Sequence, residues 1–175
     1  MLFRSPVDTD RVIASGFSMG GYATWGLALR YPDRFAAIAP FSASISRRDR
    51  PPFVDNGMRF LVDNLKRTPA FFAHGSRDGM VPANSDRFVA ERLRKLGASP
   101  VYHELPKAGH SLGGWLGRPE NRKELLTWLS SKRRESQPKI IEHRLTSGYM
   151  GRAFWVEGLE PSSSRASLRA RSEEH

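Results

Sequence analysis

The chain of 175 residues has the length of one domain with a short appendage, and its composition, 39% hydrophobic and 26% charged, is typical of a globular protein with a packed core. No apolar run approaches the roughly 18 residues that a membrane span needs, and the absence of cysteine excludes disulfides, thiolate metal sites and a cysteine nucleophile. The net charge of +10 is spread along the chain, as +3, +4 and +3 over residues 1–50, 51–131 and 132–175, so it predicts a basic surface and no nucleic-acid site.

The first predicted elements are a strand, a turn and a helix. Residues 12–17 form a short apolar run typical of a buried strand, and the next apolar residues recur at helical spacing, at Tyr22, Trp25 and Leu29. Pro32 disfavours helical geometry in the residue before it, so the helix is expected to end there. A second apolar run over 35–41 predicts the next strand.

Further elements alternate between strand and helix. An irregular segment over 43–68, with a short helix around 58–66, separates the second strand from the third. The later elements are strands over 70–75 and 101–105 and helices over 84–96 and 121–133. Four strands that alternate with helices predict an α/β fold with a parallel sheet.

The character of the sequence changes after residue 134. Short β-prone pieces at 140–146 and 153–157 and a serine-rich stretch at 162–164 are joined by glycine and proline. We therefore divide the chain into a domain over 1–134 and a β-prone or partly disordered tail over 135–175.

The motif Gly16-Phe17-Ser18-Met19-Gly20 closes the first strand and opens the helix. The pattern Gly-x-Ser-x-Gly alone arises easily by chance, but this strand-turn-helix setting is the one a nucleophile elbow requires. A serine at such a sharp turn adopts a strained backbone, and we expect glycine at 16 and 20 because side chains there would collide. The backbone N–H of Met19, at the helix N-terminus, would face a developing oxyanion. A Gly-Ser turn without chemistry is the plain alternative.

Asp78 and His110 follow Ser18 in the chain order Ser, Asp, His of this kind of elbow. Each lies just past a predicted strand, where the catalytic groups of parallel sheets gather. A serine hydroxyl is a weak nucleophile until a base takes its proton; an imidazole suits that role, and Asp78 would fix its tautomer. We predict Ser18, Asp78 and His110 as the catalytic residues, without a cofactor or a metal.

Other residues are alternatives for these roles, and Asp78 and His110 are themselves compatible with plain surface loops. The rival acids after the second strand are Asp49, Asp55 and Asp63. His74 precedes the acid and is expected to pack or hydrogen-bond beneath the site. The remaining histidines fit less well, since His103 lies inside a strand and His143 in the tail.

These residues resemble the C-terminal half of α/β-hydrolases of the prolyl-oligopeptidase-like and carboxylesterase-like kind, which include feruloyl-esterase-like bacterial predicted peptidases. The likeness extends from about Val7 to Arg133 and rests on four stretches: 16–21, 31–37, 74–82 and 109–110. It implies a partial α/β-hydrolase fold and a serine hydrolase that cleaves an ester, or else a peptide, of a small-molecule substrate through an acyl-enzyme. A truncated, non-catalytic remnant or interaction module is the alternative.

The sequence departs from that pattern at its start. In this fold the elbow follows the fifth strand and a second oxyanion donor comes from the loop after the third, yet 17 residues precede Ser18. The missing strands would need on the order of 80 residues, so we expect a fragment or a misplaced start, an unpaired apolar edge at 12–17 and poor solubility without a partner.

Location and substrate stay open at this point. No signal peptide is visible, and a cytoplasmic location holds if Met1 is the true start. The oligomeric state is not indicated. Loop 43–68, Phe41 and Trp115 are candidates to line the substrate pocket, with plain surface or core roles as the alternative.

Overall fold

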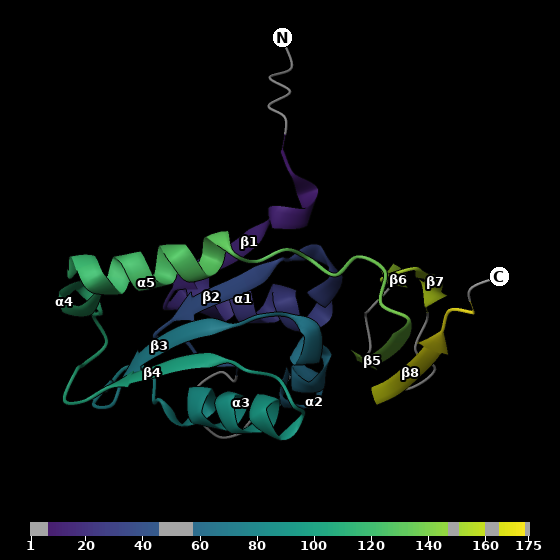
Figure 1. The fold of residues 1–175 in the computed structure, drawn as a ribbon. Coiled ribbons are helices and arrows are strands. Elements are labelled where there is room, and N and C mark those ends of the chain that lie inside the picture. The colour runs from purple at the N-terminus through teal and green to yellow at the C-terminus, as the bar shows by residue number, and fades with distance from the viewer. Residues whose placement is uncertain (1–6, 46–57, 147–150, 160–164, 174–175) are drawn as a thin grey trace, which may run out of the picture.

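The computed structural model describes residues 7–45, 58–146, 151–159 and 165–173. Its centre is a sheet of four parallel strands that follow one another in chain order (Figure 1). These strands are β1 (Ile13–Phe17), β2 (Ala37–Phe41), β3 (Phe71–Gly75) and β4 (Val101–Leu105). The α/β class predicted from the apolar runs is therefore confirmed.

Helices cover both faces of the sheet (Figure 1). On one face lie α1 (Met19–Arg30), α2 (Met58–Leu61), the 3-10 helix η3 (Val62–Arg67) and α3 (Asn84–Lys95), and on the other lie α4 (Gly113–Leu116) and α5 (Pro119–Ser130). Two short 3-10 helices, η1 (Thr9–Arg11) and η2 (Pro32–Arg34), precede β1 and β2. The last helix was expected at 121–133 but begins at Pro119, because proline suits the first turn, where its missing N–H is not needed.

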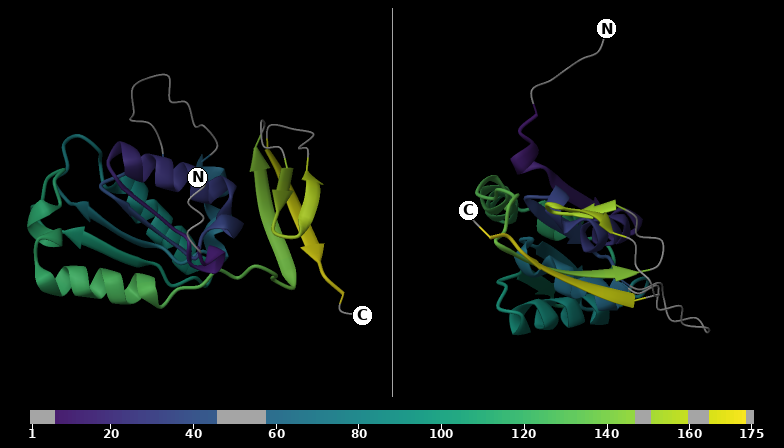
Figure 2. Two further views of the ribbon diagram at one scale, coloured as in Figure 1. Left: turned by 90° about the horizontal axis from the view of Figure 1, so that it is seen from above. Right: turned by 90° about the vertical axis from the view of Figure 1, so that its right-hand side faces the viewer.

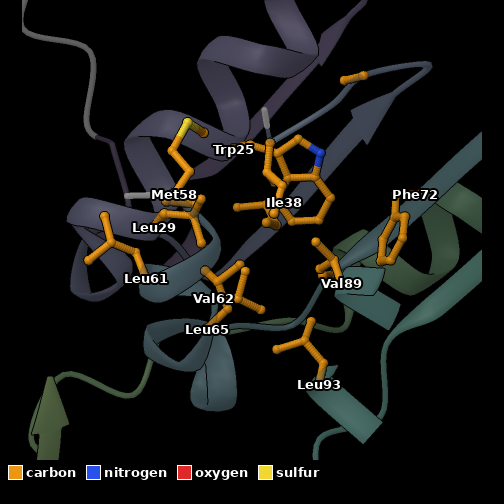
Figure 3. Close-up of a cluster of buried hydrophobic side chains, with 14 of the residues drawn as sticks. Trp25, Leu29, Ile38, Met58, Leu61, Val62, Leu65, Phe72, Val89 and Leu93 are labelled. Carbon is orange, nitrogen blue, oxygen red and sulfur yellow. The ribbon is translucent and has the colours of Figure 1, made fainter. Parts of the chain in front are cut away.

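The core consists of two clusters, one on each face of the sheet. The larger one packs Trp25 and Leu29 of α1 and Leu93 of α3 against Ile38 and Phe72 (Figure 3). The other lies under α5 and contains the strand residues that point the opposite way, Ala39, Phe41, Phe71 and Ala73. Every residue of β2 and β3 is buried, which is why both read as continuous apolar runs.

The outer strand β1 is less covered than the central strands. Within the described parts of the chain it pairs with β2 alone, in the register Ile13 to Ala37 and Phe17 to Phe41. Ile13 and Phe17 remain 37% and 45% exposed. As far as the described residues show, the outer edge of this strand has no hydrogen-bonded neighbour strand and has apolar side chains beside it.

The tail forms two antiparallel pairs at the end of the sheet where the parallel strands begin (Figures 1 and 2). One pair joins β5 (Ile140–Thr146) to β8 (Arg165–Arg171), and the other joins β6 (Gly151–Ala153) to β7 (Val156–Leu159). The piece expected at 153–157 is thus not one strand, since it contains the turn between β6 and β7. The stretch 162–164 lies outside the described residues.

The tail packs on η3 through two hydrogen bonds between a side-chain amide of η3 and the backbone of β5. The Asn64 amide donates to the carbonyl of Arg144 at 2.9 Å and accepts from its backbone N–H at 2.6 Å. The Arg144 side chain forms an ion pair with Asp63, and Ile141 and Leu145 are buried. The division at 134/135 stays a prediction, because these contacts tie the tail to the rest of the chain.

None of the helices in the described ranges combines the length and apolar character needed to cross a membrane.

Candidate active site

Ser18 occupies the turn between β1 and α1 with φ 53° and ψ −115°. A non-glycine residue at positive φ is strained, and it persists only where its surroundings hold it. Two hydrogen bonds do so here: the Ser18 N–H donates to the carbonyl of Phe41 at 2.9 Å, and the Ser18 carbonyl accepts from the N–H of Tyr22 at 2.9 Å. The strand-turn-helix setting expected of an elbow is therefore present.

The glycines around this turn have different roles. A Cβ at Gly16 would collide with the backbone of Gly20, so the expected steric need at 16 is confirmed. At Gly20 a Cβ would meet no atom within 4 Å, so the same expectation for Gly20 is wrong. Gly21 is the constrained position instead, because its Cβ would lie 2.6 Å from that of Ala43.

Ser18, His110 and Asp78 form a continuous chain of hydrogen bonds. His110 Nε2 lies 2.9 Å from Ser18 Oγ, and His110 Nδ1 lies 2.7 Å from Asp78 Oδ2. The three residues come from the carboxyl ends of β1, β3 and β4, which meet at one edge of the sheet. The Asp78 side chain is fully buried while that of His110 is 17% exposed, so the series leads from the interior toward solvent.

Asp78 is held as a carboxylate by the turn that carries it. Its Oδ1 accepts from the backbone N–H groups of Met80 at 2.9 Å and Val81 at 2.8 Å. Burial raises the pKa of Asp78, but these two bonds and the bond from His110 outweigh it and lower the pKa below its usual value. At neutral pH the group is therefore an anion that accepts hydrogen bonds on both oxygens without a proton of its own.

The loops that carry Asp78 and His110 are packed tightly together. Arg77 N–H donates to the carbonyl of Ala108 at 2.9 Å. A Cβ at Gly75 would overlap the backbone of Ala108 and Gly109, so the close approach depends on glycine at this position. His74 and Gly75 belong to the stretch 74–82 that resembles the family. This close contact explains why glycine stands at position 75.

Two residues that sequence reasoning missed also hold His110. Ser42, fully buried after β2, donates its hydroxyl to the backbone carbonyl of His110 at 2.9 Å. The ring of Phe17 lies 5.0 Å from the imidazole, centroid to centroid. Phe17 lies inside the Gly-x-Ser-x-Gly motif, so sequence reasoning could have named it as a neighbour of the site. Nothing in the local sequence distinguishes Ser42 from the serines that follow it.

Met19 is the first residue of α1, where backbone N–H groups have no partner within the helix. Met19 is 84% exposed, so its side chain is not part of the core. The helix dipole places partial positive charge at the same point. These features fit the role of oxyanion donor expected for Met19.

The alternatives named from the sequence lie elsewhere. Asp63 pairs with Arg92 and Arg144, His103 with Glu124, and His143 is buried in the tail. Asp49 and Asp55 lie outside the described residues.

The pocket candidates also have other surroundings. Phe41 is buried in the sheet beside Phe17. Trp115 packs against the rings of Phe71 and His103, in the core cluster under α5. Of the loop over 43–68 that was expected to contribute, residues 46–57 lie outside the described residues, and residues 58–67 form α2 and η3.

A parallel sheet with a strained serine between strand and helix, and an acid and a histidine after later strands, defines the α/β-hydrolase class. Residues 1–114 match the model of the phospholipase/carboxylesterase family, so the chain belongs to that family.

Two curated relatives and one solved structure illustrate the likeness. The chain is 32% identical over 107 residues to a poly(3-hydroxyoctanoate) depolymerase of Pseudomonas fluorescens, a match covering 60% of this chain and 36% of that one. It is 29% identical over 114 residues to the mouse lysophospholipase-like protein 1, covering 62% and 44%. The crystal structure of a thermostable esterase matches with a TM-score of 0.57 and 26% identity, over 73% of this chain and 32% of that one. The chain thus spans less than half the length of these relatives.

Proposed function

We propose that this chain carries the catalytic residues of a serine hydrolase that cleaves ester bonds of small molecules through an acyl-enzyme. The observation that carries the proposal is the unbroken series of hydrogen bonds from Ser18 Oγ through His110 to Asp78. Membership in the phospholipase/carboxylesterase family supports the choice of an ester. Peptide cleavage is the second candidate, because the same chemistry acts on amides.

The first half of the proposed reaction is acylation. His110 Nε2 takes the hydroxyl proton as Ser18 Oγ attacks the ester carbonyl carbon, and Asp78 stabilises the imidazolium through its Nδ1–H. The negative oxygen of the tetrahedral intermediate faces the N–H of Met19. His110 then gives its proton to the departing alkoxide, and the acyl group remains on Ser18.

The second half is deacylation by water. Water replaces the alcohol, and His110 Nε2 takes a proton from it as its oxygen attacks the acyl carbonyl carbon. Collapse of the second intermediate breaks the bond to Ser18 Oγ, which regains its proton from His110. The products are a carboxylic acid and an alcohol, and no step needs a metal or a cofactor.

A fluorophosphonate probe tests this assignment, because it phosphonylates an activated serine whatever acyl group the enzyme prefers. We expect labelling of the folded chain that is lost in Ser18→Ala and in His110→Ala. Ser99→Ala, which removes an exposed serine after α3, is the matched control and should label normally. A folded chain that is not labelled, or labelling that survives Ser18→Ala, would favour a non-catalytic remnant.

Rates on p-nitrophenyl esters of increasing acyl length, a feruloyl ester and a dipeptide amide would then separate the two candidate substrates. The proposal predicts hydrolysis of at least one ester and a much slower reaction with the amide. A faster reaction with the amide would favour a peptidase.

A further inference from the structure

A second imidazole–carboxylate pair lies beneath the proposed triad. His74 in β3 and Asp86 in α3 have fully buried side chains, and His74 Nδ1 lies 2.7 Å from Asp86 Oδ2. Neither group takes part in the steps proposed above. Buried ionisable groups are costly unless their partners hold them, so a pair placed here requires a physical reason.

The partners of His74 determine where its protons are. Its Nε2 lies 2.8 Å from the backbone carbonyl of Val81 and 3.3 Å from Asp78 Oδ2. A carbonyl and a carboxylate oxygen only accept, so Nε2 must carry a proton; its hydrogen bond goes to the Val81 carbonyl, and Asp78 Oδ2 lies within ion-pair distance of the same N–H. On the other side of the ring, a distance of 2.7 Å between Nδ1 and a carboxylate also requires a proton between them.

The electrostatics agree with this arrangement. Burial lowers the pKa of His74, but the hydrogen bond to Asp86 and the charges of Asp86 and Asp78 raise it above its usual value. Burial raises the pKa of Asp86 to about 6, against the opposing effects of His74 and Trp25. Both shifts favour the protonated form of each group, in agreement with a proton shared between them.

We propose that His74 and Asp86 are a positioning pair for the catalytic acid, so that Ser18, His110, Asp78, His74 and Asp86 form one connected series of hydrogen bonds and an ion-pair contact. The inference rests on the proposed function of the first three residues. The proton shared between Asp86 and His74 Nδ1 is additional to the one on Nε2, so Nε2 keeps its proton as a donor, whereas His110 Nε2 stays free to accept one. The Nε2–H of His74 then holds the turn of Asp78 through the Val81 carbonyl and attracts one carboxylate oxygen of Asp78 at 3.3 Å.

The position of His74 and Asp86 shows how they would orient the carboxylate of Asp78. Asp78 lies in a turn that leads from β3 to α3, and Val81 closes that turn by donating its N–H to Asp78 Oδ1. His74 binds the carbonyl of the same Val81 and the other oxygen of Asp78. One ring thus links the carboxylate to its own turn and, through Asp86, to the core helix. Contacts on both oxygens oppose rotation of this carboxylate away from His110.

Two similar substitutions separate positioning from mere packing. In His74→Gln the side-chain amide nitrogen reaches the place of Nε2 and keeps the donor to Asp78. In His74→Asn it reaches only the place of Nδ1, so that donor is lost. Both leave a buried amide in β3, and thermal unfolding measures the stability that each loses.

The first readout is the rate at which the fluorophosphonate labels Ser18 in the full chain. We expect His74→Gln to stay close to the wild-type rate and His74→Asn to fall by about 10-fold, the lower end of what a hydrogen bond to a charged group is worth. His103→Gln, a half-exposed histidine of the neighbouring strand, is the control and should not change the rate. Equal rates in the Gln and Asn variants would overturn the proposal.

The second readout does not depend on activity. NMR of the imidazole nitrogens of the wild type should find His74 Nε2 protonated, and the His110 Nδ1 proton should exchange with solvent faster in His74→Asn than in His74→Gln. A bare Nε2 on His74 in the folded wild type would overturn the proposal even if neither variant folds. If the wild type is not labelled at Ser18, the proposed function fails while the NMR measurement still decides the positioning role.

Discussion

Asp78→Asn offers a sharp test of the proposed triad, because the hydrogen bonds around Asp78 determine what an amide would do there. Oδ1 accepts two backbone N–H groups, and Oδ2 faces His110 Nδ1 at 2.7 Å and His74 Nε2 at 3.3 Å. An amide oxygen can replace Oδ1 at the two N–H groups. Its NH₂ group then points at His110, where it requires an unprotonated Nδ1.

The consequence is the wrong tautomer of His110. With Nδ1 bare, Nε2 carries the proton and cannot accept the one from Ser18 Oγ. A change of this kind in a serine-histidine-aspartate site reduces turnover by about 10⁴-fold, which corresponds to about 5.5 kcal/mol of barrier. The NH₂ group would also face the donor on His74, which adds to the loss.

Rates of Ser18 labelling and of ester hydrolysis, compared with Ser18→Ala as the floor, measure the effect. Asp63→Asn is the matched control, because it removes a carboxylate that pairs with Arg92 and Arg144 away from the site. A folded Asp78→Asn variant that keeps a rate within about 10-fold of wild type, a loss of only about 1.4 kcal/mol, would refute the assignment of Asp78.

Further changes give independent outcomes. Gly75→Ala should push the loops of Asp78 and His110 apart and slow Ser18 labelling by about 10²-fold, whereas Gly79→Ala, where a Cβ meets no atom within 4 Å, should not. Burial lowers the pKa of His143 to about 4, so between about pH 6.5 and 4 the unfolded chain binds a proton that the folded chain does not. The free energy of unfolding should therefore fall by up to about 3 kcal/mol as the pH drops through this range. Urea unfolding should show this loss in wild type and not in His143→Leu. Asn64→Ala should loosen the tail by about 2 kcal/mol and speed its cleavage in limited proteolysis; unchanged cleavage would contradict the docking role of Asn64.

The sheet could be predicted because its central strands are buried on both sides. Residues 37–41 and 71–75 are apolar almost throughout, and a short continuous apolar run in an α/β chain is typical of a central strand. Strand β8 alternates exposed and half-buried positions, but its half-buried side chains are two alanines and one leucine, so its apolar signal is weak. Its pairing with β5 depends on contacts across the tail, which no local pattern contains.

The proposed site was predicted where its residues stand in motifs and not where they act through distant partners. Ser18, Asp78 and His110 were proposed from the elbow motif and from chain order. Ser42 and Asp86 could not be found in this way, because each is defined by a partner elsewhere in the fold, His110 and His74 respectively.

The most direct test of the central claim is to trap the acyl-enzyme. The chain is mixed with a p-nitrophenyl ester, quenched in acid and digested, and the peptide that contains Ser18 is weighed by mass spectrometry. We predict that this peptide gains the mass of the acyl group in wild type and not in Ser18→Ala or His110→Ala. An acyl group found on another residue, or release of p-nitrophenol that persists in Ser18→Ala, would contradict the claim.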